Sequence, residues 1–100
     1  MQRAYSVSQI QFDCLSYIKE FGARPDEWLA GACADPHALL QERFAVERAH
    51  HALWLTRPAL TPRAAAAVVA RLHGRYAVRL AGLRPGDEHG RHVFLVRPDH

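Results

Sequence analysis

The N-terminal third of the chain has the hydrophobic pattern of one helix and one buried strand. Apolar residues recur near the 3.6-residue helical period at Val7, Ile10, Cys14, Ile18 and Phe21. Ser6 and Gln9 have the spacing of a capping box before this helix, and Gly22 follows its last turn. A turn around Pro25 leads into an apolar run. We therefore predict a helix over 6–21 and a strand over 28–33.

The middle of the chain predicts a second helix and a second strand. Asp35 provides an N-cap acceptor, and Pro36 follows at the first helical position, where its missing amide hydrogen costs nothing. The inner side of this helix would be formed by Leu39, Leu40 and Phe44. We expect the helix to end near Arg48, and the alternating run 52–56 to form a strand that Arg57-Pro58 ends.

The C-terminal half begins with the strongest helix signal. Thr61-Pro62 repeats the cap-then-proline pattern, residues 63–73 are good helix formers, and Gly74 provides a stop. Its core stripe would be Ala65, Val68, Val69 and Leu72.

Two further strands are predicted at the end of the chain. They cover 76–83 and 92–96, and the segment 84–90 between them is rich in the proline, glycine and acidic residues of turns. We expect the two strands to pair as a hairpin. The order αβαβαββ predicts an α/β (α+β) fold, with a small central mixed or antiparallel sheet flanked by helices.

Length and composition are those of one small globular domain spanning residues 1–100. Apolar residues make up 49% of the chain and charged residues 23%. No stretch approaches the roughly 18 consecutive apolar residues of a membrane-spanning helix, and the first residues lack a signal-peptide pattern. We therefore expect a cytoplasmic protein without a membrane partner.

The two cysteines do not form a metal or redox motif. Cys14 and Cys33 are too far apart for a CxxC pair, so we interpret both as buried small apolar residues. The alternative is a Cys14–Cys33 disulfide, which would need an oxidising compartment.

The seven histidines suggest a metal site most strongly at His50-His51, with His37 or His73. Adjacent histidines at a helix end point in different directions and lack the i, i+4 spacing of two helical ligands. His89 and His92 flank a turn and form a weaker pair. The sequence also lacks GxGxxG and GxxxxGK motifs and a glycine-flanked nucleophile serine. We therefore expect no metal, no cofactor and no catalytic residue.

Positive charge is concentrated in the second half of the chain. Residues 1–50 hold five Lys or Arg against seven Asp or Glu, whereas residues 51–100 hold eight Arg against three acids. Such an imbalance favours phosphates or an acidic partner. The alternative is codon bias of a GC-rich genome, because the chain has twelve Arg and one Lys and is rich in alanine.

The stretch from Ile18 onward contains Ile-Lys, Gly, Pro, Glu-Trp, Leu-Ala-Gly, Asp-Pro and Leu in that order. It resembles small bacterial proteins related to the GIY-YIG nuclease superfamily, in which this stretch reads as an aromatic pair, Val-Gly-Ile, Asp-Pro and a basic residue before Leu. The resemblance continues through Trp54 and an alanine-rich helix to Phe94, and covers roughly three quarters of the chain. It implies a GIY-YIG-like fold.

The residues that carry nuclease chemistry in that family are replaced here. The family uses an aromatic hydroxyl to help activate water, an Arg to stabilise the phosphate and a Glu to hold a divalent metal. Those positions fall on Leu29, on Leu39 and within Ala64–Ala67. Only Arg43, one helical turn beyond Leu39, could replace the phosphate clamp. We therefore expect a degenerate scaffold, with residual metal-dependent endonuclease activity as an alternative.

A binding function is the main prediction. The candidate contacts to DNA or RNA are Arg57, Arg63, Arg71, Arg75, Arg79 and Arg91. Arg63 and Arg71 are eight residues apart and share a helix face, and Arg75 would lie just past that helix.

Two further expectations concern the hairpin and a cleft. Arg79 and Arg91 would lie on the polar side of the predicted hairpin. The candidate cleft residues are Trp28, Gly31, Arg43 and Trp54. The alternative function is a protein-interaction or homodimer module that uses an apolar edge around Trp54 or the hairpin.

Overall fold

The computed structural model describes residues 4–22, 24–44, 53–82 and 86–97. Within these ranges it has three α-helices, two short 3₁₀ helices and four strands. In chain order they are α1 (Val7–Glu20), η1 (Pro25–Glu27), β1 (Leu29–Cys33), α2 (Pro36–Phe44), β2 (Leu53–Pro58), α3 (Pro62–Tyr76), β3 (Arg79–Leu80), η2 (Asp87–His89) and β4 (His92–Arg97). The predicted α/β class and the order αβαβαββ are confirmed.

The strands form one mixed sheet in the order β2-β4-β1-β3. β4 lies between β2 and β1 and is antiparallel to both, whereas β3 is parallel to β1. Gly31 of β1 pairs with Phe94 of β4, and a Cβ at Gly31 would come within 2.6 Å of the Phe94 ring. The glycine therefore makes room for an aromatic side chain in the central strand pair.

The predicted hairpin between the last two strands is wrong. β3 pairs with β1, because the Arg79 N–H donates to the Trp28 carbonyl (3.0 Å) and the Ala81 N–H donates to the Ala30 carbonyl (2.9 Å). β1 therefore separates β3 from β4. Parallel pairing requires a long crossover, which here contains α2, β2 and α3.

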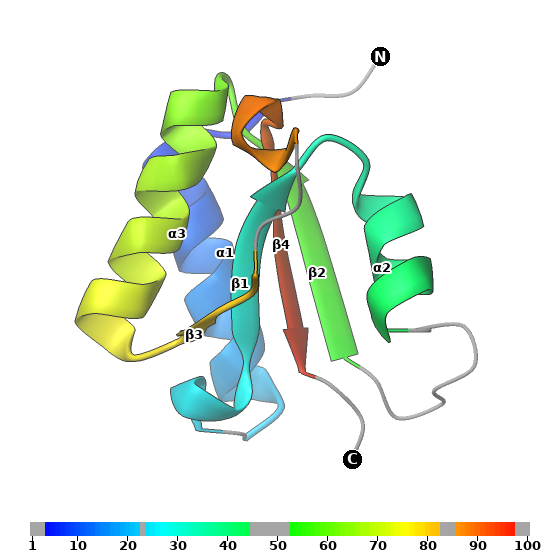
Figure 1. Cartoon of the computed structure of the whole chain (residues 1–100). Helices are drawn as coiled ribbons and strands as arrows, with labels where there is room; N and C mark the ends of the chain where they lie inside the picture. Colours follow the sequence, from blue (N-terminus) through cyan, green and yellow to red (C-terminus); the bar gives the residue numbers. More distant parts are fainter. Residues whose placement is uncertain (1–3, 23, 45–52, 83–85, 98–100) are drawn as a thin grey trace.

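Helices cover both faces of the sheet (Figure 1): α1 and α3 lie on one face and α2 lies on the other. Side chains of β1 alternate between these layers, as expected for a strand. Trp28, just before the strand, and Ala30 pack with α1 and α3, whereas Leu29 and Cys33 pack with α2. A strand covered on both faces must be apolar on both sides, which explains the continuous apolar run.

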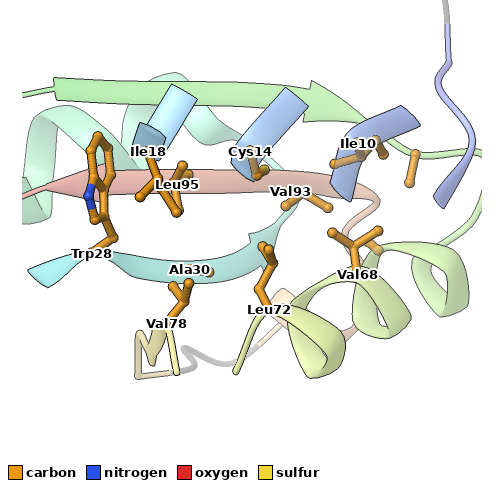
Figure 2. Close-up of a cluster of buried hydrophobic side chains, with 12 residues drawn as sticks. Ile10, Cys14, Ile18, Trp28, Ala30, Val68, Leu72, Val78, Val93 and Leu95 are labelled. Carbon is orange, nitrogen blue, oxygen red and sulfur yellow. The ribbon is translucent and has the colours of Figure 1, made fainter. Parts of the chain in front are cut away.

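The larger cluster of buried side chains contains twelve residues and lies between the sheet and the pair α1 and α3. Figure 2 shows its helical members facing the strands, among them Ile10, Cys14, Ile18, Val68 and Leu72. The helical periodicity had predicted these core positions, and they are confirmed.

The smaller cluster contains six buried residues and lies between the sheet and α2: Cys33, Leu39, Leu40, Ala81, Phe94 and Val96. Both cysteines are free and buried, as predicted. Cys14 belongs to the larger cluster and Cys33 to the smaller one, so the sheet separates the two thiols. The alternative of a Cys14–Cys33 disulfide is therefore wrong.

The starts of α1 and α3 follow their capping signals. The Ser6 hydroxyl accepts from the Gln9 N–H (3.1 Å), and the Thr61 hydroxyl accepts from the Ala64 N–H (3.0 Å). The predicted stop at Gly74 is wrong, because α3 continues to Tyr76. Tyr76 packs against the larger cluster, and this contact offsets the cost of about 1 kcal/mol for a glycine inside a helix.

The predicted strand over 76–83 is also wrong in its extent, because Tyr76 belongs to α3 and β3 contains only Arg79–Leu80. The remaining boundaries differ less from the predictions. β2 continues through Arg57 and Pro58, which were expected to end it. Proline is tolerated there because β2 is the edge strand of the sheet. The predicted end of the second helix near Arg48 and the histidine pair His50-His51 lie outside the described residues.

Candidate nucleic-acid interface

The structure places half of the candidate arginines on one helix. Arg63, Arg71 and Arg75 belong to α3, and all three are exposed. Arg75 was expected beyond the helix, but α3 includes it because the helix passes Gly74. We call these three residues the α3 arginine row. With a rise of about 1.5 Å per residue, the row extends about 18 Å along the helix axis.

The arginine row is purely cationic. The segment Pro62–Tyr76 contains no Asp or Glu. Within the described residues, none of the three guanidinium groups forms a hydrogen bond or an ion pair. By contrast, Arg24 is bound to Asp26 and Arg57 to Asp13. The described part of the fold therefore leaves the positive charge of the row without a paired acid.

Short side chains lie beside the row. Ala66, Ala70 and Gly74 are exposed on the same helix, and a Cβ at Gly74 would meet no atom within 4 Å. Long neutral side chains would hold a partner away from the helix, whereas alanine and glycine permit close approach. The arginines are therefore the longest groups that α3 presents to solvent.

Arg57 has a structural role in this fold. Its Nε donates to Asp13 Oδ2 (3.1 Å), its Nη1 donates to the Thr56 carbonyl (2.8 Å), and its guanidinium lies 5.5 Å from the Tyr5 ring centroid. These contacts join β2 to α1 and to the start of the described chain. Sequence reasoning grouped Arg57 with the binding residues because its partner is 44 positions away.

Arg91 and Arg79 lie in different places, since the hairpin that would have held them does not exist. Arg91 is exposed just before β4, and its Nη1 donates to the Ala59 carbonyl (3.2 Å). Ala59 is close to the cap of α3, so Arg91 lies at the same end of the molecule as Arg63. Arg79 is exposed on the edge strand β3.

The four candidate cleft residues are not brought together. Trp28 is 0% exposed in the larger cluster, whereas Trp54 faces α2, with its ring centroid 6.4 Å from that of His37. Gly31 faces Phe94, in the α2 layer. Arg43 lies in the last turn of α2, and its side chain is outside the described part of the chain.

The positions aligned with the family's nuclease groups are also separated. Leu39 is buried in the smaller cluster, with Leu29 packed against that cluster. Ala64 and Ala65 pack into the larger cluster on the opposite face of the sheet. These positions do not converge on one polar cleft.

Sequence reasoning missed a hollow on the flank of α3 beside the arginine row, between that helix, β1, β3 and η2. Its only sequence signal was the alanine run of α3, which we interpreted as plain helix. Among the described residues, no group of three or more His, Cys, Asp or Glu is placed to hold a metal ion. No described helix has the length and hydrophobicity needed to cross a bilayer.

Comparisons with protein-family models, with curated proteins and with solved structures found no match to this chain. The GIY-YIG resemblance therefore stays a prediction from the sequence.

Proposed function

We propose that the protein is a nucleic-acid-binding module that contacts the phosphates of DNA or RNA through the α3 arginine row. The observation that carries the proposal is an exposed row of three arginines, on a helix without acids, that has no partner within the described residues. Guanidinium groups suit phosphate oxygens because they donate two parallel N–H bonds.

The dimensions of the row support this choice. One duplex strand presents a phosphate about every 3.4 Å along its axis, so a row of about 18 Å can reach several phosphates of one backbone. The short residues Ala66, Ala70 and Gly74 permit the helix itself to come close. Arg91, near the start of α3, adds a cation at one end.

The alternative is a protein-interaction or homodimer module that uses the apolar edge around Trp54, and it has less support. Trp54 belongs to the edge strand β2, whose backbone is partly occupied. The Tyr5 N–H already donates to the Pro58 carbonyl (2.8 Å), and Arg57 donates to the Thr56 carbonyl. Pro58 has no N–H to offer. These contacts occupy part of the β2 edge, which is how natural sheets discourage edge pairing.

The first test is salt dependence. A fluorescent DNA duplex and a fluorescent single-stranded RNA are titrated with the protein, and binding is followed by anisotropy. Three phosphate contacts to duplex DNA predict a loss of affinity of about 40-fold between about 50 and 200 mM salt. Absent binding at low ionic strength, or binding that does not depend on salt, would contradict the proposal.

The second test separates the row from net charge. Arg71→Glu and Lys19→Glu change the net charge equally, but Lys19 is exposed on α1. We expect Arg71→Glu to weaken binding strongly and to reduce the salt slope by about one phosphate contact. We expect Lys19→Glu to have a small effect. Equal weakening by both variants would show that the row is not the contact surface.

A further inference from the structure

The hollow on the flank of α3 beside the arginine row has a volume of about 420 Å³ and an almost entirely apolar lining. α3 contributes Ala66, Ala70 and His73, β3 contributes Leu80, and the η2 region contributes Asp87 and Gly90. We call it the α3 hollow. Its volume lies within the range of about 300–1,000 Å³ that is typical of small-molecule sites.

The α3 hollow and the arginine row use neighbouring flanks of one helix. Positions 66, 70 and 73 follow the i, i+4, i+7 spacing and share a flank. At 3.6 residues per turn, Arg63 lies beside Ala70 at the edge of that flank, whereas Arg71 and Arg75 turn away from it. The hollow exists because alanines stand at 66 and 70, where longer side chains would fill the space.

Both polar side chains of the α3 hollow offer hydrogen-bond acceptors. His73 Nδ1 lies 2.9 Å from the Val78 carbonyl oxygen. Because a carbonyl only accepts, Nδ1 carries the hydrogen, and Nε2 of the neutral ring is left with a lone pair. Asp87 is 9% exposed as a residue and lines the hollow. Its carboxylate has several acceptor sites, so it can bind a donor in addition to its contacts within the protein.

Two further acids border the hollow next to Asp87. Asp87 also lines a neighbouring hollow of about 240 Å³, together with Asp35 and Glu42. Among the described residues that line either hollow there is no Lys or Arg. An apolar space bordered by acceptors and carboxylates complements a ligand that has an apolar body and a cationic donor.

We propose that the α3 hollow binds a small amine with an apolar or aromatic body. The body occupies the space beside Ala66, Ala70 and Leu80, and the ammonium group donates to the Asp87 carboxylate. The negative carboxylate of Asp87 then pairs with the positive ammonium group, so that the ligand's charge is not buried without a partner. This site has the opposite charge preference to the arginine row and does not depend on it.

The test uses phenethylamine as the probe. Hydrocinnamate has the same ring and linker but a carboxylate, and ethylamine has the cation without the ring. Binding is followed by backbone nitrogen–proton correlation spectra. We expect phenethylamine to shift the amide signals of Ala66, Ala70 and Gly90, and the two control compounds to leave them unchanged. Equal effects of phenethylamine and hydrocinnamate, or no shift up to the solubility limit of the amine, would overturn the proposal.

Variants locate the site. Asp87→Asn should weaken phenethylamine binding about tenfold or more, because a charged hydrogen bond is lost. Ala70→Leu should abolish binding by filling the hollow, whereas Ala67→Leu places the same side chain on the outer flank of α3 and should have no effect. Unchanged binding in Ala70→Leu would overturn the proposal even if Asp87→Asn fails to fold. Arg71→Glu should leave amine binding intact, so this test and that of the nucleic-acid proposal can fail separately.

Discussion

At the residue scale, Gly90 shows how the absence of a side chain can fix the packing of a loop. A Cβ at Gly90 would lie 2.1 Å from the carbonyl carbon of Cys33, which is backbone and cannot move aside. We expect Gly90→Ala to lower the free energy of unfolding by about 3 kcal/mol, measured by urea denaturation.

Gly74→Ala is the matched control for this prediction, because a Cβ there would have open space within 4 Å apart from the backbone of α3 itself. It should raise the free energy of unfolding by about 1 kcal/mol, since alanine is the better helix former. If both variants were equally stable, the close approach at Gly90 would not be a constraint on the fold.

His92 gives the second prediction, on pH dependence. Burial lowers its pKa below the ordinary value of 6.5. Arg91 and His37 lower it further, and together these effects exceed the opposing effect of Asp35. The unfolded chain then binds the proton more readily than the folded chain. Stability from neutral His92 is complete above pH 6.5 and is lost as the pH falls below that value toward the lowered folded pKa.

The measurement is urea unfolding of wild type and His92→Gln at two pH values, one above and one below the ordinary histidine pKa. The wild type should lose more stability on acidification than the variant does. An identical loss in the two proteins would assign the acid sensitivity to other groups.

At the element scale, the helices were predictable because their signals are local. The caps Ser6 and Thr61 and the spacing of buried residues within α1 and α3 all lie within a few positions of each other. The shared face of Arg63 and Arg71 follows from the same periodicity. Local sequence patterns are sufficient to predict a helix and its buried face, because neither depends on contacts that are distant in sequence.

The sheet was less predictable because its pairings are distant in sequence. Arg79 pairs with Leu29, although α2, β2 and α3 lie between them in the sequence. No local turn motif could have predicted that pairing. The role of Arg57 depends on Asp13 in the same way. The α3 hollow depends on β1, β3 and η2 meeting one flank of α3, which also requires the tertiary structure.

The end of α3 gives a prediction at this scale. Ala77 caps the helix with φ of 62°, a left-handed conformation that costs a residue with a Cβ about 1 kcal/mol. Ala77→Gly should therefore stabilise the protein by about that amount. Ala67→Gly, the same change in the middle of α3, should destabilise it by a similar amount. Two destabilised variants in thermal or urea unfolding would contradict this interpretation of the cap.

At the scale of the whole molecule, the two helical layers on the faces of the sheet differ in how many residues they bury. Among the described residues, twelve buried residues form the cluster between the sheet and the pair α1 and α3, whereas six form the cluster on the α2 side. The free energy that holds a layer closed grows with the apolar surface that it buries. The α2 layer should therefore open more readily, and the sheet with α1 and α3 should stay folded when it does.

The reactivity of the two cysteines measures how readily each layer opens, because Cys14 lies in the larger cluster and Cys33 in the smaller one. Burial raises the pKa of Cys14 to about 12 and that of Cys33 to about 11, with Asp87 and Asp35 contributing to the latter. Neither thiol should react in the closed protein, because the thiolate is the reactive form. Alkylation then requires opening of a layer.

We expect iodoacetamide to label Cys33 faster than Cys14, measured by mass spectrometry of peptides at low urea concentrations. The Cys33 rate should rise weakly with urea, because opening of α2 exposes little surface, and the Cys14 rate should rise steeply, because it requires global unfolding. In a Cys33→Ala variant, iodoacetamide should label Cys14 with the same steep dependence on urea concentration. Equal rates and equal urea dependence for the two thiols would show that both layers unfold as one cooperative unit.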